Sequence, residues 1–302
     1  MTALLALSCG PDSPEADDAG PDAETPADPD DGGPDLGPEE EAEPWLRFDR
    51  VPLEGEPTTI VDGQSVNTVF IFTNGETNST RLENIVIQNG SYAGEGGGMY
   101  IKNAQPWIMN CTFLYNTAED GAGVYLEDSY NVKFEGCRFL YNQADYSGGG
   151  LYAGSNTYMQ IWDSTFDGNN AQSGGGALLF STGYQAVIHD TEFVANSAQY
   201  GGGLYAYYVY VNMDGNVFRD NIAEDQGGGV KLYECNGSIQ DCTLLDNSAN
   251  IGGGVYVNSD YGTSIIGTHF EGNGATSSGG GLYSGYDYDP LYMYECTFVD
   301  NM

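Results

Sequence analysis

Residues 201–229 read GGGLYAYYVYVNMDGNVFRDNIAEDQGGG, and this stretch decides the fold. Within it Leu204 and Ala206 alternate with Tyr205. Alternation with a period of two indicates short β-strands and leaves no room for helices. Three such strands, separated by glycine or Asx turns, return the chain to its starting point, displaced by one strand spacing.

The same stretch recurs along the chain with three marks in a fixed order. The first mark is a glycine triplet, imperfect only at Gly121-Ala122-Gly123, and it begins at Gly96, Gly148, Gly174, Gly201, Gly227, Gly252 and Gly279. The second mark is Phe-x-x-Asn, with Leu244 and Val86 as variants in the phenylalanine position. The third is an apolar residue five positions before each of these from Phe113 onward.

Each mark has a role in folding. A glycine triplet suits a corner that needs positive φ and close approach between coils. The phenylalanines are expected to stack inside the core. The asparagines are expected at a turn that tolerates left-handed geometry, where each amide bonds its equivalent in the next coil. The predicted ladder comprises Asn89, Asn116, Asn142, Asn169, Asn196, Asn221, Asn247, Asn273 and Asn301.

These marks predict an all-β fold, a right-handed single-stranded parallel β-helix of about nine coils with roughly 26 residues each. The right hand follows from the handedness of parallel crossovers. Gly-Gly-Gly-Leu-Tyr followed by Phe-x-x-Asn resembles the GGA[ILV] and FxxN repeats of the polymorphic outer membrane protein family, over residues 85–302. This resemblance implies a surface-exposed, adhesin-like member of the pectin-lyase-like superfamily. Family members usually continue into a C-terminal β-barrel, which residues 1–302 lack. A fragment or a partner-covered end is therefore expected, and end-to-end association at the open last coil is one form that such a partner takes.

Three regions are predicted. Residues 1–9 resemble a truncated lipoprotein signal in which Cys9 is lipidated, although Ala6 and Leu7 depart from the usual order. Residues 10–44 hold fourteen acidic residues, eight prolines and no Lys or Arg, which predicts a disordered linker. Residues 45–302 form the β-helix domain. A lipid anchor with a spacer predicts a cell outer membrane or cell-surface location, facing outward, with membrane contact only through the anchor.

Charge excludes one class of partner. Lys and Arg total 8 against 44 Asp and Glu, a formal net charge of −36. Such a chain repels nucleic acid phosphates. The expected partner is therefore a glycan or a surface protein.

A search for chemistry favours a protein that is not an enzyme. Four aspartates come nearest to forming a row at equivalent positions of successive coils: Asp163, Asp190, Asp214 and Asp241. Because Asp214 falls one position earlier in its repeat than the other three, we interpret them as Asx turns. A calcium site or a catalytic cleft is the alternative. His189 and His269 lie three coils apart, too far for one metal, and are expected in surface turns. No metal or cofactor is expected, apart from calcium held weakly by turn carboxylates such as Glu119-Asp120 and Glu224-Asp225.

The cysteines other than Cys9 leave two interpretations open. Four of them share a small-residue slot two positions before the phenylalanine or leucine, and Cys235 lies outside it. Buried free thiols are favoured over disulfides such as Cys111–Cys137 or Cys235–Cys242, because stacked side chains point the same way. The four in the slot are Cys111, Cys137, Cys242 and Cys296.

One row of tyrosines is the candidate binding stripe. Each member follows the inward residue after a glycine triplet and so points outward, with interruptions at Leu178 and Lys231; the members are Tyr100, Tyr125, Tyr152, Tyr205, Tyr256 and Tyr283. An exposed aromatic stripe can stack on sugar rings or partner side chains, although a ladder that only stabilises the sheet explains it too. The sequence thus favours an adhesin-like lipoprotein that binds without catalysis. The alternatives are a polysaccharide lyase or glycoside hydrolase and a structural surface filament.

Overall fold

The computed structural model describes residues 46–47, 59–155, 157–180, 185–258, 262–285 and 290–302. The chain divides into two units, Met1–Pro44 and Trp45–Met302. Cys9 and the acidic segment 10–44 lie outside the described residues. All regular structure in the described residues is β, and the strands are parallel throughout.

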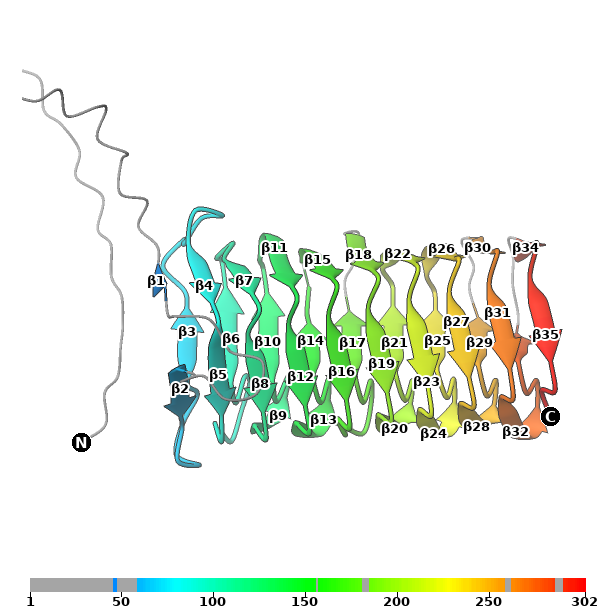
Figure 1. Cartoon of the computed structure of the whole chain (residues 1–302), viewed down its shortest axis with the longest axis horizontal. Coiled ribbons are helices and arrows are strands. Elements are labelled where there is room, and N and C mark those ends of the chain that lie inside the picture. Colours follow the sequence, from blue (N-terminus) through cyan, green and yellow to red (C-terminus); the bar gives the residue numbers. More distant parts are fainter. Residues whose placement is uncertain (1–45, 48–58, 156, 181–184, 259–261, 286–289) are drawn as a thin grey trace, which may run out of the picture. The chain divides into compact units, whose positions relative to one another are not determined.

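Three long sheets run the length of the unit Trp45–Met302, because each strand pairs with its equivalents in the neighbouring coils (Figure 1). Sheet A comprises β1 (Leu46–Arg47), β4 (Arg81–Glu83), β7 (Trp107–Met109), β11 (Tyr130–Glu135), β15 (Tyr158–Trp162), β18 (Gln185–His189), β22 (Tyr210–Asp214), β26 (Asn236–Gln240), β30 (Thr263–Ile266) and β34 (Tyr292–Tyr294). Sheet B comprises β2 (Thr59–Asp62), β5 (Ile85–Gln88), β8 (Thr112–Leu114), β12 (Arg138–Leu140), β16 (Thr165–Asp167), β19 (Glu192–Val194), β23 (Val217–Arg219), β27 (Thr243–Leu245), β31 (His269–Glu271) and β35 (Thr297–Val299). Sheet C comprises β3 (Phe70–Phe72), β6 (Met99–Lys102), β10 (Val124–Glu127), β14 (Leu151–Ala153), β17 (Ala177–Phe180), β21 (Leu204–Tyr207), β25 (Val230–Tyr233), β29 (Val255–Asn258) and β33 (Leu282–Ser284).

A fourth strand per coil, beyond the three that the alternation predicts, forms sheet D between sheets B and C. Its strands are β9 (Thr117–Asp120), β13 (Gln143–Ser147), β20 (Ser197–Tyr200), β24 (Ile222–Gln226), β28 (Ser248–Ile251) and β32 (Gly274–Ser278). Isolated bridges at Asn170 and Ser173 connect β13 to β20. Each coil therefore runs through sheets C, A, B and D, which confirms the predicted parallel β-helix.

The glycine triplets make the corner from sheet D to sheet C. The first glycine of each triplet has positive φ, for example 63° at Gly148. The third has a different constraint, since a Cβ on Gly150 would lie 2.5 Å from the carbonyl oxygen of Gly176 in the next coil. Positive φ and close backbone contact therefore both require glycine here.

The core is a column of inward side chains that repeats once per coil. Phe139 stacks on Phe166 with ring centroids 4.2 Å apart, and Phe166 stacks on Phe193 at 4.8 Å. All three rings are fully buried. Burial of one such side chain stabilises the fold by about 1.5–3 kcal/mol.

An asparagine ladder closes the corner from sheet B to sheet D. The Nδ2 of Asn142 donates to the Oδ1 of Asn169 at 2.9 Å and to the carbonyl oxygen of Phe113 at 3.0 Å. The backbone N–H of Asn142 donates to the same Oδ1 at 3.0 Å. This pattern runs from Asn116 to Asn301.

Two details of the predicted ladder are wrong. Asn89 is not a rung: Ile87 pairs with Phe113, so Gly90 stands opposite Asn116 and its N–H donates to the Asn116 Oδ1 at 2.8 Å. The left-handed residue is also not the asparagine but the residue before it, as at Tyr115, where φ is 53°. The rung asparagines themselves point inward, and those from Asn116 to Asn273 are fully buried.

Candidate functional site

The tyrosine row lies on the outer side of sheet C, in register from coil to coil. The rings of Tyr100 and Tyr125 have centroids 5.5 Å apart and are inclined by 3°, and those of Tyr125 and Tyr152 are 4.8 Å apart. Tyr256 and Tyr283 stack at 5.3 Å. The ring faces are therefore turned to one another along the coil axis, and less of them is available to a ligand.

The expectation that this row is exposed is wrong. Tyr125 is 8% exposed and Tyr256 is 7% exposed, and the other row members are half-buried. Sheet D, which the sequence did not predict, adjoins sheet C at the glycine corner, and the ring centroid of Tyr200 in β20 lies 6.4 Å from that of Tyr205. Burial raises the pKa of Tyr152 to about 12 and also raises the pKa of Tyr125. The candidate stripe is thus a covered ladder, and its binding role stays a prediction.

Glu127 occupies the next outward position on sheet C and binds the start of the row. Its Oε1 accepts hydrogen bonds from Lys102 Nζ at 2.7 Å and from Tyr100 OH at 3.2 Å. Hydrogen bonding to Glu127 raises the pKa of Lys102. The polar groups at this end of the row are already matched to one another.

Lys231 interrupts the row but belongs to it. Its Nζ lies 3.9 Å from the ring centroid of Tyr200 and 4.5 Å from that of Tyr205, with Tyr233 and Tyr256 within 5.9 Å. Burial lowers the pKa of Lys231 to about 8. Among the described residues no carboxylate lies within ion-pair distance of Lys231, so its polar environment consists of the aromatic faces and the more distant negative charge of Asp225. The side chain of Leu178, the other interruption, is not described.

The aspartate row has the geometry of turns. Asp163, Asp190 and Asp241 have φ between 46° and 48° at the corner from sheet A to sheet B. Asp214 ends β22, and Gly215 takes the left-handed position in that coil with φ 66°. The one-residue offset of Asp214 is therefore real.

Both histidines lie in strands on outer faces and not in turns, which corrects the expectation. His189 of β18 places Nδ1 2.8 Å from an Asp190 carboxylate oxygen and Nε2 3.4 Å from one of Asp214. His269 belongs to sheet B, with Nε2 3.0 Å from Glu271. Within the described ranges no group of three or more His, Cys, Asp or Glu side chains is arranged to hold a metal ion.

The acidic pairs of sheet D are also in strands. Glu119 and Asp120 belong to β9, and Glu224 and Asp225 belong to β24, although turns were expected. Burial raises the pKa of Asp120. Calcium binding at these carboxylates stays a prediction.

The five cysteines of the described part are free thiols, and four of them are fully buried. Cys137 Sγ lies 3.4 Å from the carbonyl oxygen of Ile108, and Cys111 Sγ lies 3.2 Å from that of Met109. Burial raises the pKa of Cys137 and of Cys235 to about 12. Such thiols are poor nucleophiles at neutral pH.

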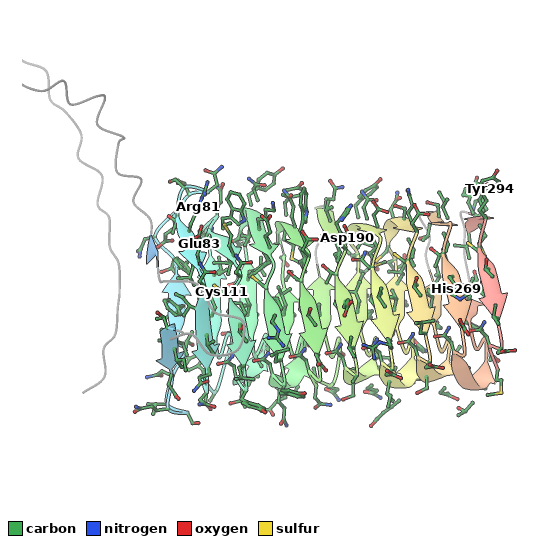
Figure 2. The ribbon with its side chains drawn as sticks, in the orientation of Figure 1. Arg81, Glu83, Cys111, Asp190, His269 and Tyr294 are labelled. Carbon is green, nitrogen blue, oxygen red and sulfur yellow. The ribbon has the colours of Figure 1, made fainter. Side chains whose placement is uncertain are left out.

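Sequence reasoning missed the outer face of sheet A, where exposed aromatic side chains gather. Trp162 is 36% exposed, Tyr210 is 44% exposed and Tyr130 is 56% exposed. Tyr294 of β34, the last strand of sheet A, lies at the upper right of Figure 2 and is 66% exposed. None of these residues is in one of the three repeat marks. The signal in the sequence was an aromatic residue at an outward position of a strand.

A cation–aromatic ladder crosses the first part of this face. Arg81 lies over Trp107 at 4.4 Å, Lys133 lies 4.8 Å from the same ring, and Lys133 lies over Trp162 at 4.0 Å. Trp162 in turn has its ring centroid 6.0 Å from that of His189. Lys133 also pairs with Glu135 at 2.8 Å. The cations in this ladder are therefore held by neighbours, which fixes the indole rings in place.

Comparison with known proteins agrees with the architecture. Residues 58–193 match the family model described as "Right handed beta helix region". The chain is a right-handed parallel β-helix. No curated protein matches it.

Two solved structures resemble the chain: the crystal structure of the periplasmic alginate epimerase AlgG, with a TM-score of 0.49 and 11% identity, and that of a point mutant of the same enzyme, with 0.45 and 12%. Each alignment covers 74% of this chain and 60% of the other, so the chain spans less than two thirds of their length. At these values the resemblance says nothing about the activity of this chain.

Proposed function

We propose that this protein is a surface-exposed, adhesin-like β-helix of the polymorphic outer membrane protein type, which binds glycan or protein partners without catalysis. The observation that carries the proposal is the exposed aromatic surface of sheet A. Trp162 and Tyr210 are large aromatic side chains that lie outside the core, and each exposes more than a third of its surface to solvent. Aromatic side chains of this kind are enriched at recognition surfaces.

The anchored location is part of the proposal. It rests on Cys9 and on the acidic segment that follows it. The described residues contain no helix that is long and apolar enough to cross a membrane. Expression of the full chain and of Cys9→Ser, followed by fractionation and radiolabelled palmitate incorporation, tests this location: label only in the chain that keeps Cys9 supports it, and equal label contradicts it.

Glycan retention tests the binding role. The full chain is applied to a panel of immobilised polysaccharides, and both retention and release of reducing or unsaturated ends are measured. Retention without product, weakened by Trp162→Ala, is the expected result. Tyr146→Ala is the matched control, because Tyr146 is 55% exposed on sheet D, away from this face.

A polysaccharide-degrading enzyme is the second candidate, and one observation favours it. His189 lies between two carboxylates next to Trp162 on an exposed face. Since both ring nitrogens are engaged, His189 is poorly placed to accept a proton. Product release that disappears in Asp214→Asn would replace the binding proposal with this one.

A further inference from the structure

The middle of the sheet A outer face is free of charged side chains over four successive strands, β15, β18, β22 and β26. We call this surface the uncharged strip; its residues are Tyr158, Gln160, Gln185, Val187, Tyr210, Asn212, Asn236 and Ser238. All eight are half-buried or exposed. In a chain with a net charge of −36, such a surface is distinctive.

The strip consists of two columns that are in register along the coil axis. Gln160 pairs with Val187, Val187 with Asn212, and Asn212 with Ser238. Gln185 pairs with Tyr210 and Tyr210 with Asn236 in the second column, where Tyr158 holds the same place on β15. Equivalent positions therefore repeat at the strand spacing of ~4.8 Å.

The side chains of the strip are suited to hydroxyl groups. Amides and hydroxyls both donate and accept hydrogen bonds, as the hydroxyls of a sugar do. Some are already oriented by neighbours: Gln160 Nε2 donates to Asn131 Oδ1 at 3.2 Å, and Ser238 Oγ donates to Asn212 Oδ1 at 3.2 Å. Oriented groups lose less side-chain entropy when a ligand binds.

Tyr210 supplies an aromatic face that the ladders do not. Its ring is 44% exposed, and in the described part of the chain it has no aromatic ring partner. The rings of Trp107 and Trp162, in contrast, have cations against their faces. The other ring of the strip, Tyr158, is half-buried and lies 5.6 Å from the ring of Tyr130, so Tyr210 is the ring of the strip most open to stacking on a sugar.

Charge argues against an acidic ligand. The strip contains no cation, and the surrounding chain carries a strong negative charge that repels polyanions. Lys133 at one end of the strip is already paired with Glu135, and the His189 ring nitrogens face the carboxylates of Asp190 and Asp214. An uncharged chain meets no such penalty.

We propose that the uncharged strip binds an uncharged, extended polysaccharide that lies along the coil axis with about one sugar per coil. This inference rests on the proposed binding function and specifies its ligand and its orientation. Because an extended sugar chain advances by about one strand spacing per sugar, successive sugars meet successive coils.

The test uses the full chain with uncharged oligosaccharides of glucan, xylan, mannan and galactan in increasing length, and with alginate and polygalacturonate as charged comparisons. At least one uncharged series is expected to bind, with an affinity that rises with each sugar up to about four, the number of strands in the strip, and that does not change between low and high salt. Tyr210→Ala with Gln185→Ala should weaken binding about tenfold or more, which corresponds to ~1.4 kcal/mol.

The matched control is Tyr146→Ala with Gln143→Ala, because both residues are exposed on β13 of sheet D. The control should bind as the parent does, and circular dichroism and thermal melting should match for all three proteins. Salt-sensitive binding of charged polymers alone would overturn the strip inference and leave the binding function intact. So would binding of an uncharged glycan that the strip variant does not weaken. Failure to bind any glycan or surface protein would overturn both.

Discussion

Asn169→Ala is the sharpest test of what holds the coils together. The Asn169 Oδ1 accepts the backbone N–H and the Nδ2 of Asn142, at 3.0 and 2.9 Å. Its Nδ2 donates to the carbonyl oxygen of Phe139 at 2.8 Å and to the Oδ1 of Asn196 at 3.0 Å. Alanine removes all four hydrogen bonds at a site that is fully buried.

The expected loss follows from what stays behind. Within the described part of the chain the Asn142 N–H has no other acceptor, so the substitution leaves it buried without a partner, at a cost of about 1–3 kcal/mol. The carbonyl oxygen of Phe139 and the Oδ1 of Asn196 each lose a hydrogen bond, and a small cavity is left. Together these losses add a similar amount to the destabilisation. Asn169→Ala should therefore lower the free energy of unfolding by roughly 3–5 kcal/mol.

Chemical denaturation of the full chain measures this loss, with Asn170→Ala as the control. Asn170 is adjacent and exposed, and its Nδ2 donates to Ser197 Oγ at 2.7 Å. An exposed hydrogen bond of this kind contributes at most about 1 kcal/mol. Because stacked repeats can unfold in parts, hydrogen exchange of the Asn142 amide is measured as well. If the two variants are equally stable, and the Asn142 amide stays protected in Asn169→Ala, the ladder does not stabilise the coils as argued.

The remaining predictions concern other parts of the coil. Gly150→Ala should destabilise the fold by several times more than Gly274→Ala in thermal melting, because the Cβ at the first site would lie 2.5 Å from the Gly176 oxygen and at the second would contact nothing within 4 Å. Cys137 has its pKa raised to about 12, so the folded state keeps a proton that the unfolded state loses above pH ~8.5, and stability should fall as pH rises through this window by up to ~1.4 kcal/mol per pH unit. Cys137→Ser should make denaturation midpoints less sensitive to pH there; an unchanged slope would argue against a buried protonated thiol. Lys231 has its pKa lowered to about 8, so its charge opposes folding below pH 8 and this effect disappears towards pH ~10.5. Lys231→Met should thus be at least as stable as the parent at pH ~7, whereas a marked loss would show that the surrounding rings compensate the charge.

Repetition predicted the fold because each mark answers one backbone or packing requirement of a coil. The phenylalanine mark fixes the register, and this is why the predicted ladder is correct from Asn116 onward. It failed at Asn89 because the first coil has no phenylalanine: Ile87 fills that place, and Val86 was taken for it. A shift of one residue reverses the facing of a strand.

The outer surfaces were harder to predict for a different reason. Alternation shows that Tyr125 faces away from the core, but it does not show what packs against that face. The strands of sheet D, which adjoin the row, are short and contain polar residues, as in Thr117–Asp120, so they give no clear pattern. The uncharged strip of sheet A is likewise invisible to repeat analysis, because its residues differ from coil to coil and share only the absence of charge.

The direction of the bonds between coils has a mechanical consequence. Backbone bonds and the asparagine ladder all run along the coil axis, and neighbouring rungs are 25 to 28 residues apart, as in the 26 residues between Asn116 and Asn142. A force along the axis that is applied to several coils at once acts on all the bonds between two neighbouring coils together. A pull on one end of the chain instead peels off a single coil at a time, and each released coil lengthens the chain by roughly 90 Å. A protein of this design therefore resists a load that is shared along its side far better than a load applied at its end.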